Sequence, residues 1–93
     1  MSIDAGSDVF IQETSRDEDG ALTSMSVIAL VIKVPDGNIV DANSSDITSP
    51  SVGVNRCRFR TTVDGTYYYT WRLEDTSGKR RVKRGKFVIG SED

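Results

Sequence analysis

Apolar and polar residues alternate one by one along two stretches of this chain, and that two-residue period restricts the fold more than any other feature. Between residues 53 and 61, Asn55, Cys57 and Phe59 fall on one side, and three arginines fall on the other. Successive side chains of a β-strand point to opposite faces. The period therefore predicts a strand with one face in a core and the other at the surface.

The stretch 66–74 has the same period and is rich in aromatic residues. One side holds Tyr67, Tyr69 and Trp71, and the other holds Tyr68 and Arg72. We expect the first three to fill the core, because large aromatic side chains bury the most apolar surface. Tyr68 is expected at the surface, where it could contact a partner.

Four further stretches combine β-branched or apolar residues with flanking turn signals. The predicted strands are 9–14, 25–34, 38–42, 53–61, 66–74 and 79–89, and the polar stretch 43–51 is predicted to be the longest loop. Turns are predicted at 16–20, 35–37, 64–65 and 76–78, where Pro, Asp, Ser and Gly gather. The alternation in the last strand shifts phase near Gly85, which predicts a β-bulge there.

Six or seven short antiparallel strands in 93 residues predict an all-β fold, an immunoglobulin-like antiparallel β-sandwich formed by a single domain over residues 1–93. Residues 1–7 and 91–93 are expected to be flexible tails. Cys57 is the only cysteine, so the domain has no internal disulfide. In this fold a tyrosine near the start of the sixth strand bonds back to an upstream turn, and Tyr67 is predicted to form this tyrosine corner, with Tyr69 and Trp71 between the sheets.

Composition argues against enzymatic and metal chemistry. The chain has no histidine, which removes the common zinc sites and every histidine base. Cys57 falls on the inward parity and is expected to be a small buried hydrophobe. Asp17, Glu18 and Asp19 lack the spacing of a calcium loop and are expected to form a solvated turn. We therefore expect no enzyme activity, no cofactor and no metal. No apolar run of membrane-spanning length and no secretory signal is present, so the chain is expected to stay in the cytoplasm.

Basic residues gather in the second half of the chain. Residues 1–50 hold two basic and nine acidic side chains, and residues 51–93 hold ten basic and five acidic ones. The predicted partner-binding face comprises Arg56, Arg58, Arg60, Tyr68, Arg72, Arg81 and Lys83. Guanidinium groups bind carboxylates well, so an acidic protein surface is one partner, and head-to-tail association of copies into a homo-oligomer is another. The same residues could instead be a solvated face or protect a sheet edge. Nucleic acid is disfavoured, because the chain is acidic overall, with an isoelectric point near 5.0.

Several motifs together resemble a known family. The Pro35-Asp36-Gly37 turn, the stretches GVNRCRF and DGTYYYTW, and the terminal GKFVIG are similar in order to small immunoglobulin-like structural proteins of tailed bacteriophages and prophages. The resemblance covers residues 20–90. It implies a virion component assembled in the host bacterial cytoplasm, such as a capsid decoration or cement protein or a head-fibre component, with the major capsid protein or another virion protein as partner. It implies no catalytic residues.

Two other functions remain open at this stage. An immunoglobulin-like adhesion module of a tail or fibre could bind a carbohydrate or receptor through exposed loops such as 43–51. An oligomeric scaffold or regulator unrelated to virions would keep the same fold.

Overall fold

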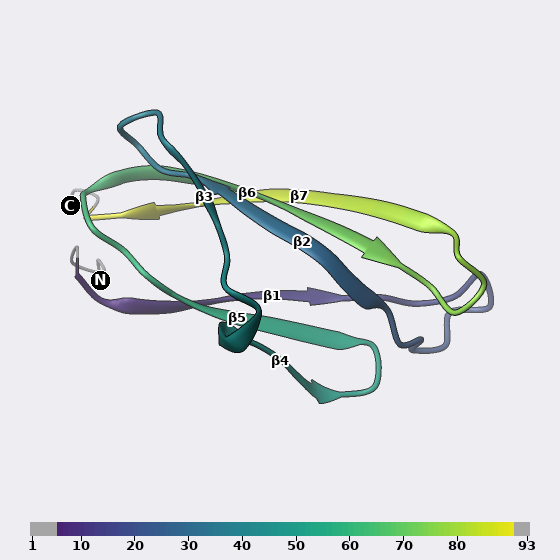
Figure 1. Cartoon of the computed structure of the whole chain (residues 1–93). Coiled ribbons are helices and arrows are strands. Elements are labelled where there is room, and N and C mark those ends of the chain that lie inside the picture. The colour runs from purple at the N-terminus through teal and green to yellow at the C-terminus, as the bar shows by residue number, and fades with distance from the viewer. Residues whose placement is uncertain (1–5, 91–93) are drawn as a thin grey trace.

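The computed structural model describes residues 6–90, which form seven strands and one short 3-10 helix (Figure 1). The elements are β1 (Asp8–Thr14), β2 (Ser26–Lys33), β3 (Ile39–Asp41), η1 (Ser44–Asp46), β4 (Ile47–Ser51), β5 (Val54–Arg60), β6 (Gly65–Glu74) and β7 (Arg80–Ile89). One sheet has the order β1-β5-β4, and the other has the order β3-β2-β6-β7. Every pairing is antiparallel.

The two sheets pack face to face, and the core lies between them (Figure 1). Its buried apolar side chains are Ile11, Met25, Leu30, Ile32, Val34, Cys57, Tyr67, Trp71, Leu73 and Ile89. They come from both sheets, as the alternation predicted. The predicted disulfide-free β-sandwich of about seven strands is therefore confirmed.

The longest apolar run of the sequence forms β2, which lies between β3 and β6. Leu30 and Ile32 point into the core and are almost fully buried. The register against β6 shifts between Val27 and Ala29, which leaves Ile28 exposed. The run is therefore a strand with a bulge, and its solvent-facing apolar residues are not core residues.

The predicted bulge at Gly85 is wrong. β6 and β7 pair without interruption from Gly65 opposite Ile89 to Glu74 opposite Arg80. Val82 faces outward, and the inward positions of the first half of β7 hold long basic side chains, which made the parity look shifted. Position 85 requires glycine for a different reason: a Cβ at residue 85 would lie 2.3 Å from the hydroxyl oxygen of Tyr69.

The stretch 43–51 is not a loop, contrary to expectation. The Asn43 side chain accepts a hydrogen bond from the Ser45 backbone at 3.0 Å and caps η1, and β4 follows at once. Polar composition hid this strand because β4 is an edge strand with little burial. Pro50 is tolerated there, since an edge strand does not need every backbone N–H for pairing.

Tyr67 makes the contact predicted for a tyrosine corner. Its hydroxyl accepts hydrogen bonds from the backbone N–H groups of Thr62 and Val63, both at 3.1 Å, and donates one to the Val63 carbonyl at 2.6 Å. The ring is fully buried and stacks on Phe87, with ring centroids 5.0 Å apart. This residue therefore fixes the turn between β5 and β6, and through it the relation of the two sheets.

Candidate functional site

The seven residues predicted as one partner-binding face lie on three different surfaces. The outer face of the three-stranded sheet holds Arg56, Arg58 and Arg60. The outer face of the four-stranded sheet holds Tyr68 and Arg72. The remaining two, Arg81 and Lys83, point between the sheets. Their parity within each strand was readable from the alternation, but the sheet to which each strand belongs was not.

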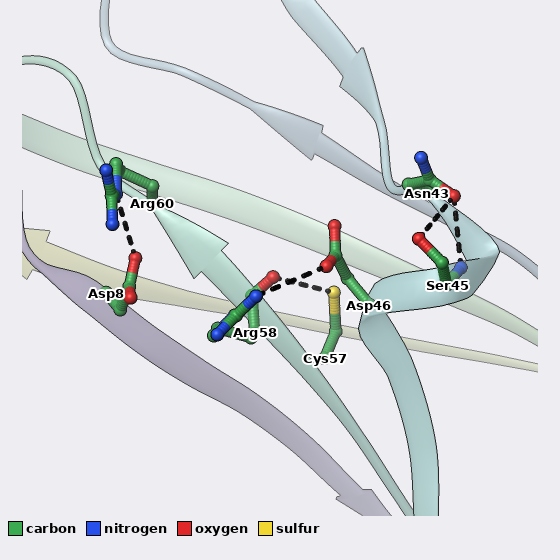
Figure 2. A network of polar contacts seen from close by, with 7 residues as sticks. All are labelled: Asp8, Asn43, Ser45, Asp46, Cys57, Arg58 and Arg60. Atoms are coloured by element: carbon green, nitrogen blue, oxygen red, sulfur yellow. Dashed lines mark hydrogen bonds and ion pairs between the residues drawn. The ribbon is translucent and has the colours of Figure 1, made fainter.

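The arginines of the three-stranded sheet are already occupied by neighbours within the chain. The Arg60 Nε atom lies 3.0 Å from an Asp8 carboxylate oxygen, and an Arg58 nitrogen lies 3.9 Å from Asp46 (Figure 2). Arg56 donates hydrogen bonds to the Gln12 side-chain oxygen, and its guanidinium lies 5.5 Å from the ring centre of Phe10. These cross-strand contacts satisfy much of the charge on this face.

The contact between Asp8 and Arg60 shifts the pKa of both side chains. The hydrogen bond from Arg60 lowers the pKa of the Asp8 carboxyl, with a smaller contribution from the positive charges of Arg60 and Arg58. The same contact raises the pKa of Arg60. Both side chains remain solvent-accessible, so the pair contributes little to stability.

Cys57 lies behind this face, in the core. Its thiol is 1% exposed and contacts the Arg58 carbonyl at 3.5 Å (Figure 2). Burial raises the pKa of the thiol, and the nearby negative charge of Asp46 adds to the effect. The inward position that the alternation predicted is confirmed.

Arg81 and Lys83 tie the two sheets together. An Arg81 guanidinium nitrogen donates to the Arg16 carbonyl at 2.8 Å, and the Lys83 ammonium donates to the Thr14 carbonyl. The Lys83 ammonium also lies 3.3 Å from a carboxylate oxygen of Glu13. Both residues therefore have a place in the fold itself.

Glu13 is the centre of a buried polar cluster that the sequence reasoning missed. It accepts hydrogen bonds from the Ser15 hydroxyl at 2.7 Å and from the Asn55 amide at 2.5 Å. The Asn55 side-chain oxygen in turn accepts from Ser49 at 2.7 Å. The signal was available, because Glu13 has the same parity as Ile11 in β1 and had to point inward. The cluster links β1, β4, β5 and β7 and satisfies the buried carboxylate.

The outer face of the four-stranded sheet carries unneutralised positive charge around an exposed aromatic ring. We name it the Tyr68 face and define it as Lys33, Tyr68, Arg72, Arg84 and Lys86, all of which are exposed. Tyr68 is 51% exposed and pairs across the sheet with Lys33 on one side and Lys86 on the other. None of the four cations makes an ion pair with another residue of the range 6–90.

Sequence reasoning placed Tyr68 and Arg72 on a candidate face but left out the other three residues. Arg84 and Lys86 are among the basic residues gathered in the second half of the chain, and their even parity matches that of Val82. Lys33 belongs to β2, and nothing in the sequence shows that β2 pairs with β6. The Tyr68 face is therefore a product of strand order.

A groove of about 600 Å³ runs between β1 and β7. Val9, Ile11, Tyr69, Phe87 and Ile89 supply most of its apolar lining. β1 and β7 are edge strands of different sheets, so the groove lies along the open side of the sandwich. Phe10, at its rim, is 63% exposed.

No cluster of metal-ligating side chains occurs in residues 6–90. The Asp17 carboxylate instead accepts hydrogen bonds from the backbone N–H groups of Asp19 and Ala21, at 2.9 and 3.0 Å, and organises its own turn. Within the same range, no helix has the length and apolar character needed to cross a membrane.

No protein family, curated protein or solved structure matches this chain.

Proposed function

We propose that this chain is a non-enzymatic binding module that docks the Tyr68 face on an acidic protein surface. The observation that carries the proposal is the group of four exposed cations around Tyr68, which have no ion-pair partner within residues 6–90. Arginine and an exposed tyrosine are favoured at protein interfaces, because they combine charge-assisted hydrogen bonds with large, stiff contact area. An exposed sheet face suits a broad contact.

Strand order supports an immunoglobulin-like assignment. Such sandwiches place strands A, B, E and D in one sheet and C, F and G in the other, and some add a strand C′. If β1 is strand B, the observed orders correspond to B-E-D and C′-C-F-G. Tyr67 then lies at the start of strand F, where this fold keeps its tyrosine corner.

The proposed setting is the particle of a tailed bacteriophage, as a decoration, cement or head-fibre protein bound to the major capsid protein or another virion protein. The support is the resemblance of motifs in the sequence. The Pro35 turn joins β2 to β3, DGTYYYTW enters and forms β6, and GKFVIG ends β7.

Two alternatives have less support. Carbohydrate or receptor binding was expected to use an exposed loop at 43–51. This segment is mostly η1 and β4, so it does not form that loop. Binding of single-stranded nucleic acid would use the same Tyr68 face, but the chain carries a net charge of −2 and exposed acidic turns, which weaken attraction to phosphates.

The setting is tested by quantitative mass spectrometry of particles from the phage or prophage whose genome encodes the chain. About one copy per capsid subunit, or per few subunits, supports shell decoration. A handful of copies per particle would move the protein to a fibre or tail. Absence from the particles would overturn the virion setting.

The binding face is tested with two matched triple variants. Arg72→Glu/Arg84→Glu/Lys86→Glu reverses the Tyr68 face, and Arg56→Glu/Arg58→Glu/Arg60→Glu reverses the opposite sheet. Each is mixed with particles that lack the protein, and co-sedimentation is measured. The first variant should lose binding at least tenfold, and the second should retain most of it, provided that circular dichroism shows both folded. The reverse result would overturn the assignment. Competition by an oligothymidine more effective than that by polyglutamate would favour nucleic acid.

A further inference from the structure

Three of the four sheet edges carry features that block pairing with another chain. β3 has only three residues, β4 contains Pro50 and a register shift, and β7 carries Arg80, Arg84 and Lys86 at its outward positions. Short strands, prolines, irregularities and positive charge are the usual means of preventing edge-to-edge association. β1, with seven residues, no proline and no lysine or arginine, has none of these features.

The hydrogen bonds at both ends of β1 show which of its backbone groups point away from β5. Ser15 donates to the Gly53 carbonyl, and Thr61 donates to the Ser7 carbonyl. Hydrogen-bonded and non-hydrogen-bonded pairs alternate along an antiparallel ladder. The pairs of residues 9, 11 and 13 with β5 are therefore the hydrogen-bonded ones. The N–H and C=O groups of Asp8, Phe10 and Gln12 point to the open edge.

These outward groups are symmetric about Phe10. We propose that a second copy of this chain pairs its β1 antiparallel to β1 of the first, with Phe10 opposite Phe10 and Asp8 opposite Gln12. In that register all three outward residues fall in hydrogen-bonded pairs, and the two three-stranded sheets join into one of six strands. A shift by one residue would lose this match, because it would set outward groups opposite inward ones.

The side chains favour the same register. Phe10, 63% exposed, would meet its own copy and lose much of its contact with water. Asp8 of one copy would lie opposite Gln12 of the other, and Gln12 is itself the cross-strand neighbour of Arg56. Each Asp8, already paired with Arg60, would therefore have the Arg56 of the other copy as a second cation nearby. The same symmetric pairing of β7 would bring Arg84 and Lys86 against basic residues of the copy, which is repulsive.

Two basic side chains of β7, Arg81 and Lys83, limit the length of the proposed contact between the two β1 strands. Lys83 donates to the Thr14 carbonyl, which is the next outward group of β1, and Arg81 donates to the Arg16 carbonyl. The second half of the open side is thus closed by side chains of β7. The contact is confined to residues 8–12, beside the groove lined by Val9, Ile11 and Phe87.

Cysteine crosslinking tests both the association and its register. Hydrogen-bonded residues of an antiparallel pair have Cα atoms about 5.5 Å apart, within the range that a disulfide spans. In a Cys57→Ala background, Phe10→Cys should form a covalent dimer under mild oxidation. Gln12→Cys is the matched control and should stay largely monomeric, because it lies opposite Asp8. The double variant Asp8→Cys/Gln12→Cys should crosslink.

The oligomeric state of the native chain is measured in parallel by sedimentation equilibrium. A dimer supports the proposal, and a monomer at every accessible concentration overturns it. Crosslinking of Gln12→Cys as complete as that of Phe10→Cys would overturn the register. Phe10→Lys and Phe10→Glu give a second check: each alone should be monomeric, and an equal mixture should form a heterodimer. The Tyr68 face is not involved, so failure of this proposal leaves the proposed function standing, and the reverse also holds.

Discussion

The ring of Tyr69 lies directly over the backbone of Gly85, its partner across β6 and β7. A Cβ at residue 85 would stand 2.3 Å from the hydroxyl oxygen and 2.4 Å from the ring carbon that bears it. Glycine in a strand costs stability because nothing packs against its neighbours. An aromatic ring laid across it restores that packing, which explains why an edge strand can keep a glycine at its centre.

Gly85→Ala should therefore destabilise the fold, by about 1–3 kcal/mol, through overpacking against the Tyr69 ring. Urea unfolding followed by circular dichroism measures the change. The same substitution in a Tyr69→Leu background should cost clearly less, because the ring that it strikes is gone. Equal costs in both backgrounds would show that the contact is not the reason for the glycine.

Tyr67→Phe should cost about 1–3 kcal/mol, because the turn loses the three backbone hydrogen bonds of the hydroxyl while the stacked ring remains. Tyr68→Phe is the matched control, since Tyr68 is half exposed and its hydroxyl makes no hydrogen bond within residues 6–90. Its unfolding midpoint should not move. A Tyr67→Phe variant as stable as the native chain would contradict the structural role of the corner.

Lys83→Met should destabilise the chain by about 1–3 kcal/mol. The substitution leaves the carboxylate of Glu13, which is 5% exposed, without its ammonium partner. This loss of stability is smaller than for a fully buried ion pair, because Lys83 is about one-third exposed. Adding Glu13→Gln to Lys83→Met should recover part of the loss, since a neutral amide tolerates burial better. Lys86→Met, on the outer side of the same strand, should be nearly neutral.

Acid should weaken the fold in part through two carboxyl groups. The pKa of Asp8 is lowered by its hydrogen bond from Arg60, and the pKa of Asp75 is lowered first by the Ser77 hydroxyl and then by the Lys79 backbone N–H. A lowered folded-state pKa stabilises the fold above the ordinary value of 3.8 and loses that stabilisation as the pH falls through the folded value.

The double variant Asp8→Asn/Asp75→Asn should therefore lose less stability than the native chain when the pH is lowered from about 5 to about 2. Thermal melts across this range give the comparison. Because both groups are exposed, added salt should shrink the difference that comes from Asp8. Parallel pH profiles for the two chains would refute this account.

Cys57 should react slowly with a thiol reagent in the native state, because its sulfur is buried and its raised pKa keeps it protonated. Labelling with iodoacetamide at pH 8 should become rapid only when urea unfolds the chain. Fast labelling of the folded protein would mean that the core opens locally near β5.

Most of the fold was predictable because most strands show in their alternation which side points inward. The alternation of β5 and β6 placed Cys57, Tyr67 and Trp71 correctly, and turn residues marked most strand ends. The candidate site was only partly predictable. It depends on which strands are neighbours, and Lys33 meets Tyr68 through a pairing of residues far apart in the sequence.

Two errors have a common physical origin. β4 was hidden because an edge strand with little burial needs no apolar pattern, and the first half of β7 was misjudged because Arg81 and Lys83 point inward. A prediction from the alternation of apolar and polar residues assumes that every inward-pointing side chain is apolar. Long basic side chains that reach backbone carbonyls break that assumption.

Trp71 gives the chain a built-in optical reporter. It is the only tryptophan of the sequence, it is fully buried, and its indole N–H finds no hydrogen-bond acceptor within residues 6–90. Fluorescence excited at the red edge of the spectrum therefore comes from a single buried position between the sheets. Separation of the two sheets, whether complete or transient, admits water to that position and shifts the emission to longer wavelength, so every variant that keeps Trp71 reports on its own core without a label.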